Sequence, residues 1–126
     1  MSKYKNKKVV LPDGTVFDSE KEYKRWCELR LLEKAGEIQN LQRQVPFVLI
    51  PTQNEEVVRF SKKTGKQLKS KMKTAEQACV YYADFTYLEN GKLVVEDVKS
   101  EATRTDLYKI KRKLLLERYG IKIKET

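Results

Sequence analysis

Short blocks of apolar residues, separated by turn residues, set the pattern of the first half of the chain. Residues 9–17, VVLPDGTVF, have apolar residues on both sides of a Pro-Asp-Gly turn and predict a small β-ribbon. Residues 19–35 carry apolar side chains at helical spacing between a polar cap and Gly36, so we expect an amphipathic helix. Residues 44–51, QVPFVLIP, form an apolar run too short for a helix, which favours a strand.

The second half begins with a strand hairpin and ends with a helix and a strand. In residues 81–100, YYADFTYLENGKLVVEDVKS, two runs rich in Tyr, Phe, Thr and Val flank Asn90-Gly91, which predicts a two-residue hairpin turn. A helix is expected over residues 106–119, between a threonine cap and a glycine, and residues 121–125 alternate as a final short strand. The predicted order is ribbon, helix, three strands, helix and strand, which indicates an α/β (α+β) fold.

The composition fits one folded domain, residues 1–126, with a preference for polyanions. The hydrophobic fraction of 40% is enough for one modest core. The 27 Lys plus Arg and 18 Asp plus Glu give a net charge of +9, which favours nucleic acid or an anionic membrane surface as partner. No apolar run reaches the length of a membrane span and no secretory signal is evident, so we expect a cytoplasmic protein that does not associate with membranes.

The residue types restrict the available chemistry. The sequence has no histidine, which excludes Ser-His-Asp and Cys-His catalysis and histidine-based nucleases. Cys27 and Cys79 stand far apart and outside any metal-binding spacing, so we expect buried, reduced thiols. Any catalysis must therefore use carboxylates, Lys, Tyr or a metal ion.

The hairpin register places two carboxylates opposite each other. With a two-residue turn, Asp84 lies directly across from Asp97, and strand alternation puts Lys99 on the same face but Ala83 and Glu96 on the other. Facing like charges destabilise a sheet unless the carboxylates share a proton, are screened by water or hold a divalent cation. Only the cation also explains the lysine, whose ammonium would orient an attacking water and stabilise charge on a phosphate. The alternative is a pair of strand-end aspartates satisfied by the lysine or by backbone amides.

Glu22 allows two interpretations. Residues 19–22 fit the S-x-x-E capping box, in which the Glu22 carboxylate would reach back to the Ser19 backbone amide. Glu22 also lies on the helix face of Trp26 and Leu29, from which a third carboxylate could approach the same cation. Both interpretations stay open at this point.

Basic residues gather in several segments. Residues 1–8, MSKYKNKK, are expected to form a mobile basic arm, and residues 52–75 a basic loop or flap. The second helix has a basic side, with Leu107, Ile110, Leu114 and Leu115 expected to pack inward. These cations form either a solvated surface or a clamp for nucleic-acid phosphates. The candidate nucleic-acid-binding residues are Lys62, Lys63, Lys66, Lys69, Lys71, Lys73, Lys109, Lys111, Arg112 and Lys113.

The order of the candidate residues resembles the motif of the PD-(D/E)XK nuclease superfamily. Glu22 lies in an opening helix, Asp84 on a strand, and Asp97-Val98-Lys99 on the next strand. More closely, the segments FDSEKE, LEKAGEIQNLQRQVPF, YYADFTYLENGKLVVEDVKS and LYKIKRKLLLERYGI resemble a family of small phage-encoded proteins placed in that superfamily. The resemblance implies a restriction-endonuclease-like αβββαβ core, with a mixed sheet flanked by helices and a small N-terminal β-ribbon. An alanine replaces the proline of the nominal motif.

The same resemblance implies a site with one or two Mg²⁺ or Mn²⁺ ions. The implied metal ligands are Glu22, Asp84, Asp97 and the carbonyl of Val98. Lys99 would position the nucleophilic water, and Gln44 would add a polar group beside the site. The resemblance covers about residues 15–125, and its motif is degenerate, so the order of elements carries as much weight as the residues.

We therefore expect a metal-dependent DNA endonuclease, encoded by a phage and working in the cytoplasm of the bacterial host. Holliday junction resolvases belong to this superfamily, so branched DNA is one candidate substrate and a homodimer one candidate assembly. Two alternatives remain. The chain is then either a nucleic-acid-binding module that has lost nuclease activity, or a structural or interaction protein of a phage.

Overall fold

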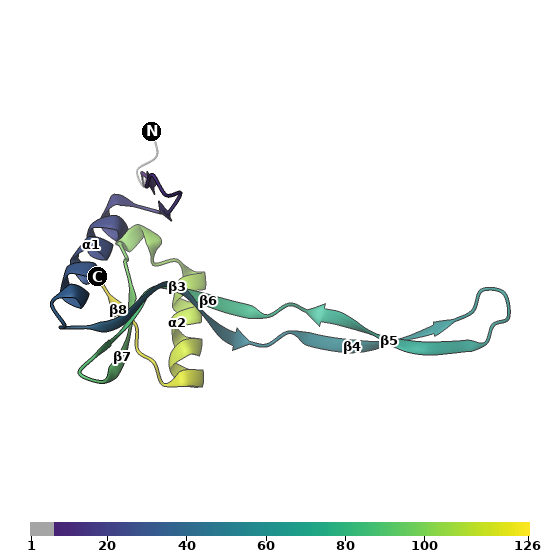
Figure 1. Cartoon of the computed structure of the whole chain (residues 1–126). Coiled ribbons are helices and arrows are strands. Elements are labelled where there is room, and N and C mark those ends of the chain that lie inside the picture. Colours follow the sequence, from purple (N-terminus) through teal and green to yellow (C-terminus); the bar gives the residue numbers. More distant parts are fainter. Residues whose placement is uncertain (1–6) are drawn as a thin grey trace.

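A long β-ribbon projects from a mixed α+β body in the computed structural model, which describes residues 7–126 (Figure 1). Most of the expected basic arm, residues 1–6, lies outside the described residues. The small N-terminal ribbon is confirmed, because β1 (Val9–Val10) and β2 (Val16–Phe17) pair antiparallel. In the part of the chain that the structure describes, neither helix is long and apolar enough to cross a membrane.

A four-stranded mixed sheet with the order β3-β6-β7-β8 forms the centre of the body. Its strands are β3 (Gln39–Ile50), β6 (Cys79–Glu89), β7 (Lys92–Asp97) and β8 (Lys124–Glu125). The first three are antiparallel neighbours, whereas β8 pairs parallel with β7. A parallel pair needs a crossover connection, which here contains the short 3₁₀ helix η1 (Glu101–Thr103) and α2 (Asp106–Tyr119).

Both helices begin and end where the sequence indicates. In α1 (Glu20–Lys34), the Ser19 hydroxyl accepts a hydrogen bond from a first-turn backbone amide at 3.1 Å. In α2, the Thr105 hydroxyl caps the N-terminus in the same way, also at 3.1 Å. Gly120 ends α2 at φ 68, a left-handed conformation that a residue without Cβ adopts most easily.

The β6–β7 hairpin has the predicted turn and register. Asn90 and Gly91 form the turn with φ of 53 and 76, as a type I′ turn requires. The ladder then runs without a slip from the turn to the pair of Phe85 with Glu96. This register determines where the candidate site lies, because Asp84 and Asp97 are the next residues of the two strands after the pair of Phe85 with Glu96.

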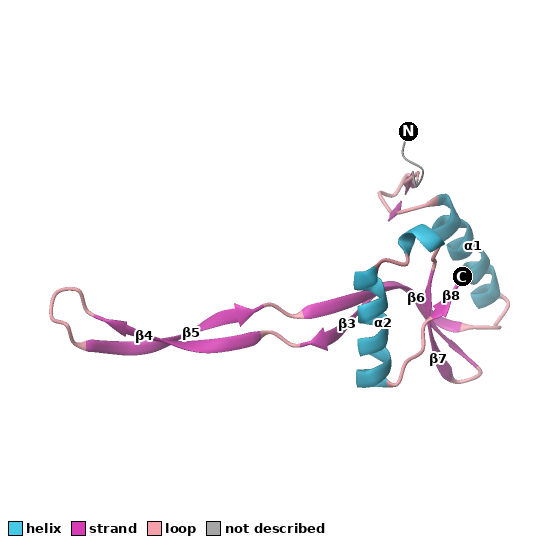
Figure 2. Ribbon diagram, turned by 180° about the vertical axis from the view of Figure 1, so that it is seen from behind, coloured by secondary structure: helices cyan, strands magenta, loops and turns pink. Residues whose placement is uncertain are grey.

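Residues 52–75 do not form the expected loop or flap. They lie mostly in a regular ribbon in which β4 (Gln53–Phe60) and β5 (Gln67–Glu76) pair antiparallel, apart from the main sheet (Figure 2). Nearly all ribbon side chains are exposed, so the sequence lacks the apolar alternation that marks a half-buried strand. Cross-strand pairs such as Glu55 with Lys73 place opposite charges next to each other, which stabilises the ribbon.

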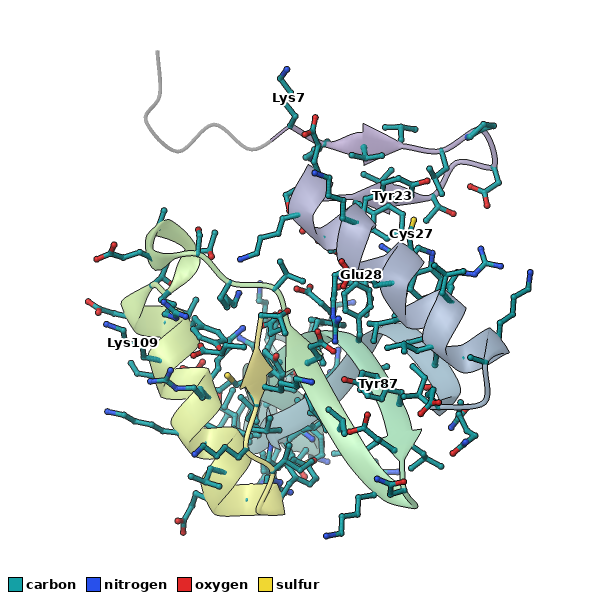
Figure 3. The ribbon with its side chains drawn as sticks, turned by 90° about the vertical axis from the view of Figure 1, so that its left-hand side faces the viewer. Lys7, Tyr23, Cys27, Glu28, Tyr87 and Lys109 are labelled. Carbon is teal, nitrogen blue, oxygen red and sulfur yellow. The ribbon has the colours of Figure 1, made fainter. Side chains whose placement is uncertain are left out.

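The two helices pack on opposite sides of the sheet (Figure 3), each with its own hydrophobic cluster. Leu29 of α1 packs with Phe85 and Tyr87, and α2 contributes Tyr108 and Leu115 to the other cluster. These two residues of α2 are seven apart and lie on one stripe of the helix.

Leu107 and Ile110 were expected to pack inward, and this prediction is wrong. Their exposed fractions are 61% and 55%. The small sheet covers only the stripe of α2 that contains Tyr108 and Leu115, which leaves the neighbouring apolar positions in contact with solvent.

The prediction for Ala83 is also wrong, because it packs in the cluster of Val95 rather than in that of Phe85. In β3, the residue before Val45, which pairs with Ala83, is Gln44, and it has φ 49, which no regular strand residue has. Strict alternation of faces therefore fails at this point of β6, next to the candidate site.

Candidate active site

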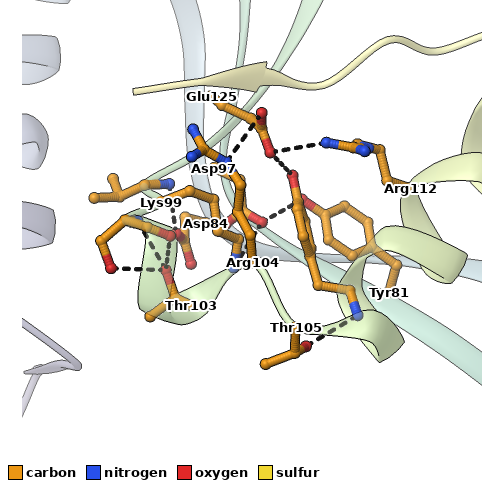
Figure 4. Close-up of polar contacts among 12 residues, drawn as sticks. Tyr81, Asp84, Asp97, Lys99, Thr103, Arg104, Thr105, Arg112 and Glu125 are labelled. Carbon is orange, nitrogen blue, oxygen red and sulfur yellow. Dashed lines mark hydrogen bonds and ion pairs between the residues drawn. The ribbon is translucent and has the colours of Figure 1, made fainter. Parts of the chain in front are cut away.

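Four of the predicted catalytic residues lie together in one pocket where β6 and β7 meet the start of α2. Figure 4 shows three of them, Asp84, Asp97 and Lys99. Gln44, Asp84, Asp97 and Lys99 line this pocket, which has a volume of about 320 Å³. Gln44 comes from β3, Asp84 from β6, Asp97 from the end of β7, and Lys99 from the segment that follows it. The hairpin register thus brings the predicted chemistry to one place.

The backbone and an amide side chain hold the Asp84 carboxylate. Its Oδ2 accepts a hydrogen bond from the Val98 backbone amide at 2.9 Å, and its Oδ1 accepts one from Gln44 Nε2 at 3.2 Å. Gln44 therefore acts beside the site as the resemblance implied. Val98 contributes its amide here, and the role of its carbonyl as a metal ligand stays a prediction.

Asp97 is the buried member of the carboxylate pair, with an exposed fraction of 2%. Its Oδ2 accepts a hydrogen bond from the Tyr81 hydroxyl at 2.9 Å. Burial, followed by the hydrogen bond and the charge of Asp84, raises the pKa of Asp97 to about 8, against the opposite effects of Lys99 and Tyr81. In the chain alone, a proton held on Asp97 near neutral pH would relieve the repulsion between the two facing carboxyls.

Lys99 lies against Asp97 in a position fixed from several sides. Its Nζ is 3.3 Å from Asp97 Oδ2 and 4.3 Å from the centre of the Tyr108 ring. Its backbone amide donates to the Thr126 carbonyl at 2.9 Å, and its own carbonyl accepts from Lys21 Nζ at 2.9 Å. The ammonium is therefore partly desolvated and held at the pocket wall, where a cation–π contact adds to the ion pair.

Glu22 is buried, with an exposed fraction of 3%, but it does not line the pocket. Its Oε2 accepts from the Asp18 backbone amide at 3.3 Å and its Oε1 lies 3.8 Å from the Arg43 guanidinium. Burial first, and then the charges of Asp84 and Asp18, raise the pKa of Glu22 to about 7. The carboxylate thus reaches the amide of residue 18, so the predicted capping box with Ser19 forms only through the serine hydroxyl.

Glu22 is near enough to Asp84 for that charge to raise its pKa, but it does not form a compact three-carboxylate group with the two aspartates. Among residues 7–126, no group of three or more His, Cys, Asp or Glu lies close enough to hold a metal ion together. The carboxylates that line the pocket are the facing pair Asp84 and Asp97, together with Asp18.

Tyr81 and Tyr108 are functional-site residues that the sequence pattern did not identify. Strand alternation assigns Tyr81 to the face away from Asp97, yet its hydroxyl donates to that carboxylate. The break in alternation between Ala83 and Phe85 explains the difference, because Tyr81 packs with Ala83 and Val95. Tyr108 lines the pocket because α2 is rotated so that this residue, and not Leu107, is buried.

The candidate cations on α2 fall into two kinds. Lys109 and Lys113 are exposed on the surface of the helix. Lys111 and Arg112 have protein partners, since Lys111 Nζ donates to the Val80 carbonyl at 2.9 Å and Arg112 lies 3.3 Å from Glu125. Lys111 also lines the pocket, which leaves it beside any phosphate that enters.

The candidate cations of the ribbon do not surround the pocket. Lys62, Lys63 and Lys66 lie in the turn between β4 and β5, and the other members of this set follow on β5. The full set is Lys62, Lys63, Lys66, Lys69, Lys71 and Lys73, all exposed. Any contact they make with nucleic acid lies away from Asp84 and Asp97.

The fold and the pocket define a mixed α+β protein with a paired-carboxylate and lysine site. The chain belongs to the family described as a protein of unknown function, DUF1064, whose model matches residues 1–125. No curated protein and no solved structure matches the chain.

Proposed function

We propose that this chain is a metal-dependent DNA endonuclease with a PD-(D/E)XK-type, restriction-endonuclease-like core, acting in the cytoplasm of a phage-infected bacterium. The observation that supports this most directly is the pair Asp84 and Asp97, brought together by the hairpin register, with the Lys99 ammonium 3.3 Å from the second carboxylate. A paired carboxylate and a lysine in one open pocket are suited to the hydrolysis of phosphodiesters.

Mg²⁺ or Mn²⁺ is the cofactor in this proposal. Asp84 and Asp97 fit it, because Mg²⁺ is usually bound through one or two carboxylates together with waters and substrate phosphate oxygens. The raised pKa of Asp97 also supports a cation site, since a divalent cation would replace the proton on Asp97 and remove the repulsion between Asp97 and Asp84. When bound, the ion would act as a Lewis acid on the phosphate.

The side chains around the aspartates have separate tasks. Lys99, held by Asp97 and the Tyr108 ring, would orient the attacking water and stabilise the charge that develops on the phosphate. Gln44 and Tyr81 would fix the orientation of the two carboxylates through the hydrogen bonds described above. Lys111 would bind an incoming phosphate from the other side of the pocket.

The test is cleavage of supercoiled, linear, single-stranded and four-way-junction DNA in Mg²⁺, Mn²⁺ or EDTA. We expect metal-dependent cleavage that Lys99→Ala reduces by about 100-fold or more. Lys92→Ala, at the exposed end of the hairpin, makes the same change away from the pocket and should cleave like the wild type. Equal rates for the folded Lys99→Ala variant and the wild type would contradict the proposed site.

A nucleic-acid-binding module without catalysis is the second candidate. The lack of a compact three-carboxylate group among the described residues favours it, because Glu22 was expected to complete the metal shell. This candidate predicts salt-sensitive DNA binding without cleavage under any of the conditions above. Preference for the four-way junction, together with a dimer in solution, would instead support a resolvase-like nuclease.

A further inference from the structure

The β4–β5 ribbon extends the direction of β3 and β6 away from the body (Figure 1). Lys73 precedes Asp84 by 11 residues along this extended chain, which corresponds to roughly 35 Å at about 3.3 Å per residue. Lys66, in the turn at the tip, precedes Asp84 by 18 residues, or roughly 60 Å. The ribbon cations are therefore placed at defined, large distances from the pocket.

The charge of the ribbon is complementary to a polyanion. From Arg59 to Lys73 the chain carries no acidic residue, and its lysines are exposed. Within residues 7–126, the ion pairs join residues of the body, and none of them includes a ribbon lysine. Exposed lysines in such an array are suited to phosphate contacts, which position a protein on DNA.

The shape of the ribbon also fits duplex DNA. The major groove of B-DNA admits a two-stranded β-ribbon. Val58, Phe60 and Met72 expose 51%, 62% and 63% of their surface on the ribbon, where no second layer of the protein covers them. Contact with sugars and base edges would remove these apolar side chains from water, which phosphate contacts alone would not achieve.

We propose that the β4–β5 ribbon lies along duplex DNA and contacts it one helical turn or more from the phosphate that is cut. This inference rests on the proposed nuclease function. A helical turn is about 34–36 Å or about 10 base pairs, so the distance of Lys73 from Asp84 equals one turn and the tip reaches about 17 base pairs. The substrate is then DNA with a long duplex arm on one side of the cut.

The experiment measures both binding and cleavage with duplex arms of increasing length, from about 6 to about 30 base pairs. A ribbon variant carries Lys69→Gln, Lys71→Gln and Lys73→Gln. A control variant carries Lys24→Gln, Lys34→Gln and Lys92→Gln, which removes the same charge from exposed positions of the body. Sedimentation of each protein reports its oligomeric state.

We expect the affinity of the wild type and of the control variant to rise with arm length up to about 17–20 base pairs, and that of the ribbon variant to stay flat. The ribbon variant should lose about 2.7 from the slope of log K against log salt concentration, because each lost phosphate contact contributes about 0.9. On long arms this corresponds to binding weaker by roughly 10-fold or more.

Two results would overturn the inference. One is a ribbon variant with the same arm-length dependence and salt slope as the control variant. The other is a wild-type dimer that the ribbon substitutions dissociate while DNA binding is unchanged, which would assign the ribbon to a second copy of the chain.

The binding data decide the inference even if no DNA is cut, so its failure is distinguishable from failure of the nuclease proposal. Conversely, a ribbon variant that cleaves DNA in Mg²⁺ and binds long duplex arms as tightly as the control variant would keep the nuclease and remove the role of the ribbon.

Discussion

Replacing Asp97 by asparagine should remove the part of the pH dependence of stability that this carboxyl contributes in the metal-free protein, and leave the part that comes from Glu22, whose pKa is raised to about 7. In the folded chain, burial and the facing Asp84 raise the pKa of Asp97 from 3.8 to about 8. The folded state thus binds this proton more tightly than the unfolded state, which stabilises the fold fully at acidic pH. The stabilisation is lost as the pH rises from about 4 to about 8, because the unfolded chain releases the proton first.

The size of the effect follows from the shift. One pKa unit corresponds to about 1.4 kcal/mol, and the pKa of Asp97 lies about three units above pH 5. The largest loss in the free energy of unfolding between about pH 5 and pH 9 is therefore roughly 4 kcal/mol. We expect a fall of about 2 to 4 kcal/mol in the free energy of unfolding, a large part of the 5–15 kcal/mol typical of a domain. The side-chain amide introduced by Asp97→Asn would stay neutral at every pH and would keep an acceptor for Tyr81 and a donor for Asp84.

The assay is urea unfolding in EDTA at several pH values, followed by the fluorescence of Trp26, the single tryptophan, which packs against Phe85. Glu89→Gln, at the exposed end of the hairpin, is the control with the same kind of charge change. Mg²⁺ at alkaline pH should restore stability to the wild type but not to Asp97→Asn. The reasoning is refuted if the wild type is as stable at about pH 9 as at about pH 5, or if Asp97→Asn keeps the wild-type slope.

Three further changes test other parts of the site and its support. Tyr81→Phe removes a hydrogen bond that lowers the pKa of Asp97, so the fall in stability with pH should move to higher pH; an unchanged or lower midpoint would contradict this. Arg25→Ala leaves Glu96, which has no exposed surface, without its ion-pair partner, and should cost about 3 kcal/mol in urea unfolding, whereas a loss below about 1 kcal/mol would argue against a buried pair. Gln44→Ala and Gln44→Gly both remove the side-chain amide that binds Asp84. Because φ at this position is 49, which glycine adopts more easily than alanine, the glycine variant should be more stable by about 1 kcal/mol. Equal stabilities would show that the position is not strained.

Local signals in the sequence were sufficient to predict the bounds of the two helices and the position of the two aspartates at the centre of the site. Caps and left-handed glycines are decided by a few neighbouring residues, so the bounds of α1 and α2 could be predicted closely. The Asn90-Gly91 turn fixes the register, and the register places Asp84 across from Asp97. These features depend on interactions within a few residues or across one ladder.

Features that depend on tertiary arrangement could not be predicted in the same way. The β4–β5 ribbon buries no face, so hydrophobic alternation gives no signal for its strands. Tyr81 reaches Asp97 because the alternation of faces breaks between Ala83 and Phe85 of β6. The contacts of Glu22 with Asp18 and Arg43, and the ion pair of Arg112, depend on how the helices sit against the sheet, which spacing along the chain does not specify.

The parallel pairing of β8 has a consequence for the order of folding. The Thr126 amide donates to the Asp97 carbonyl at 3.0 Å, and its carbonyl accepts from the Lys99 amide at 2.9 Å, so β8 holds the segment that carries the lysine. The β6–β7 hairpin closes through neighbouring residues, whereas this strand docks only after α2 has crossed over, and contacts of such sequence separation form slowly. We expect the two aspartates to meet early and the lysine to be fixed late, so that a slow refolding phase seen by amide protection near Lys99 would precede full activity.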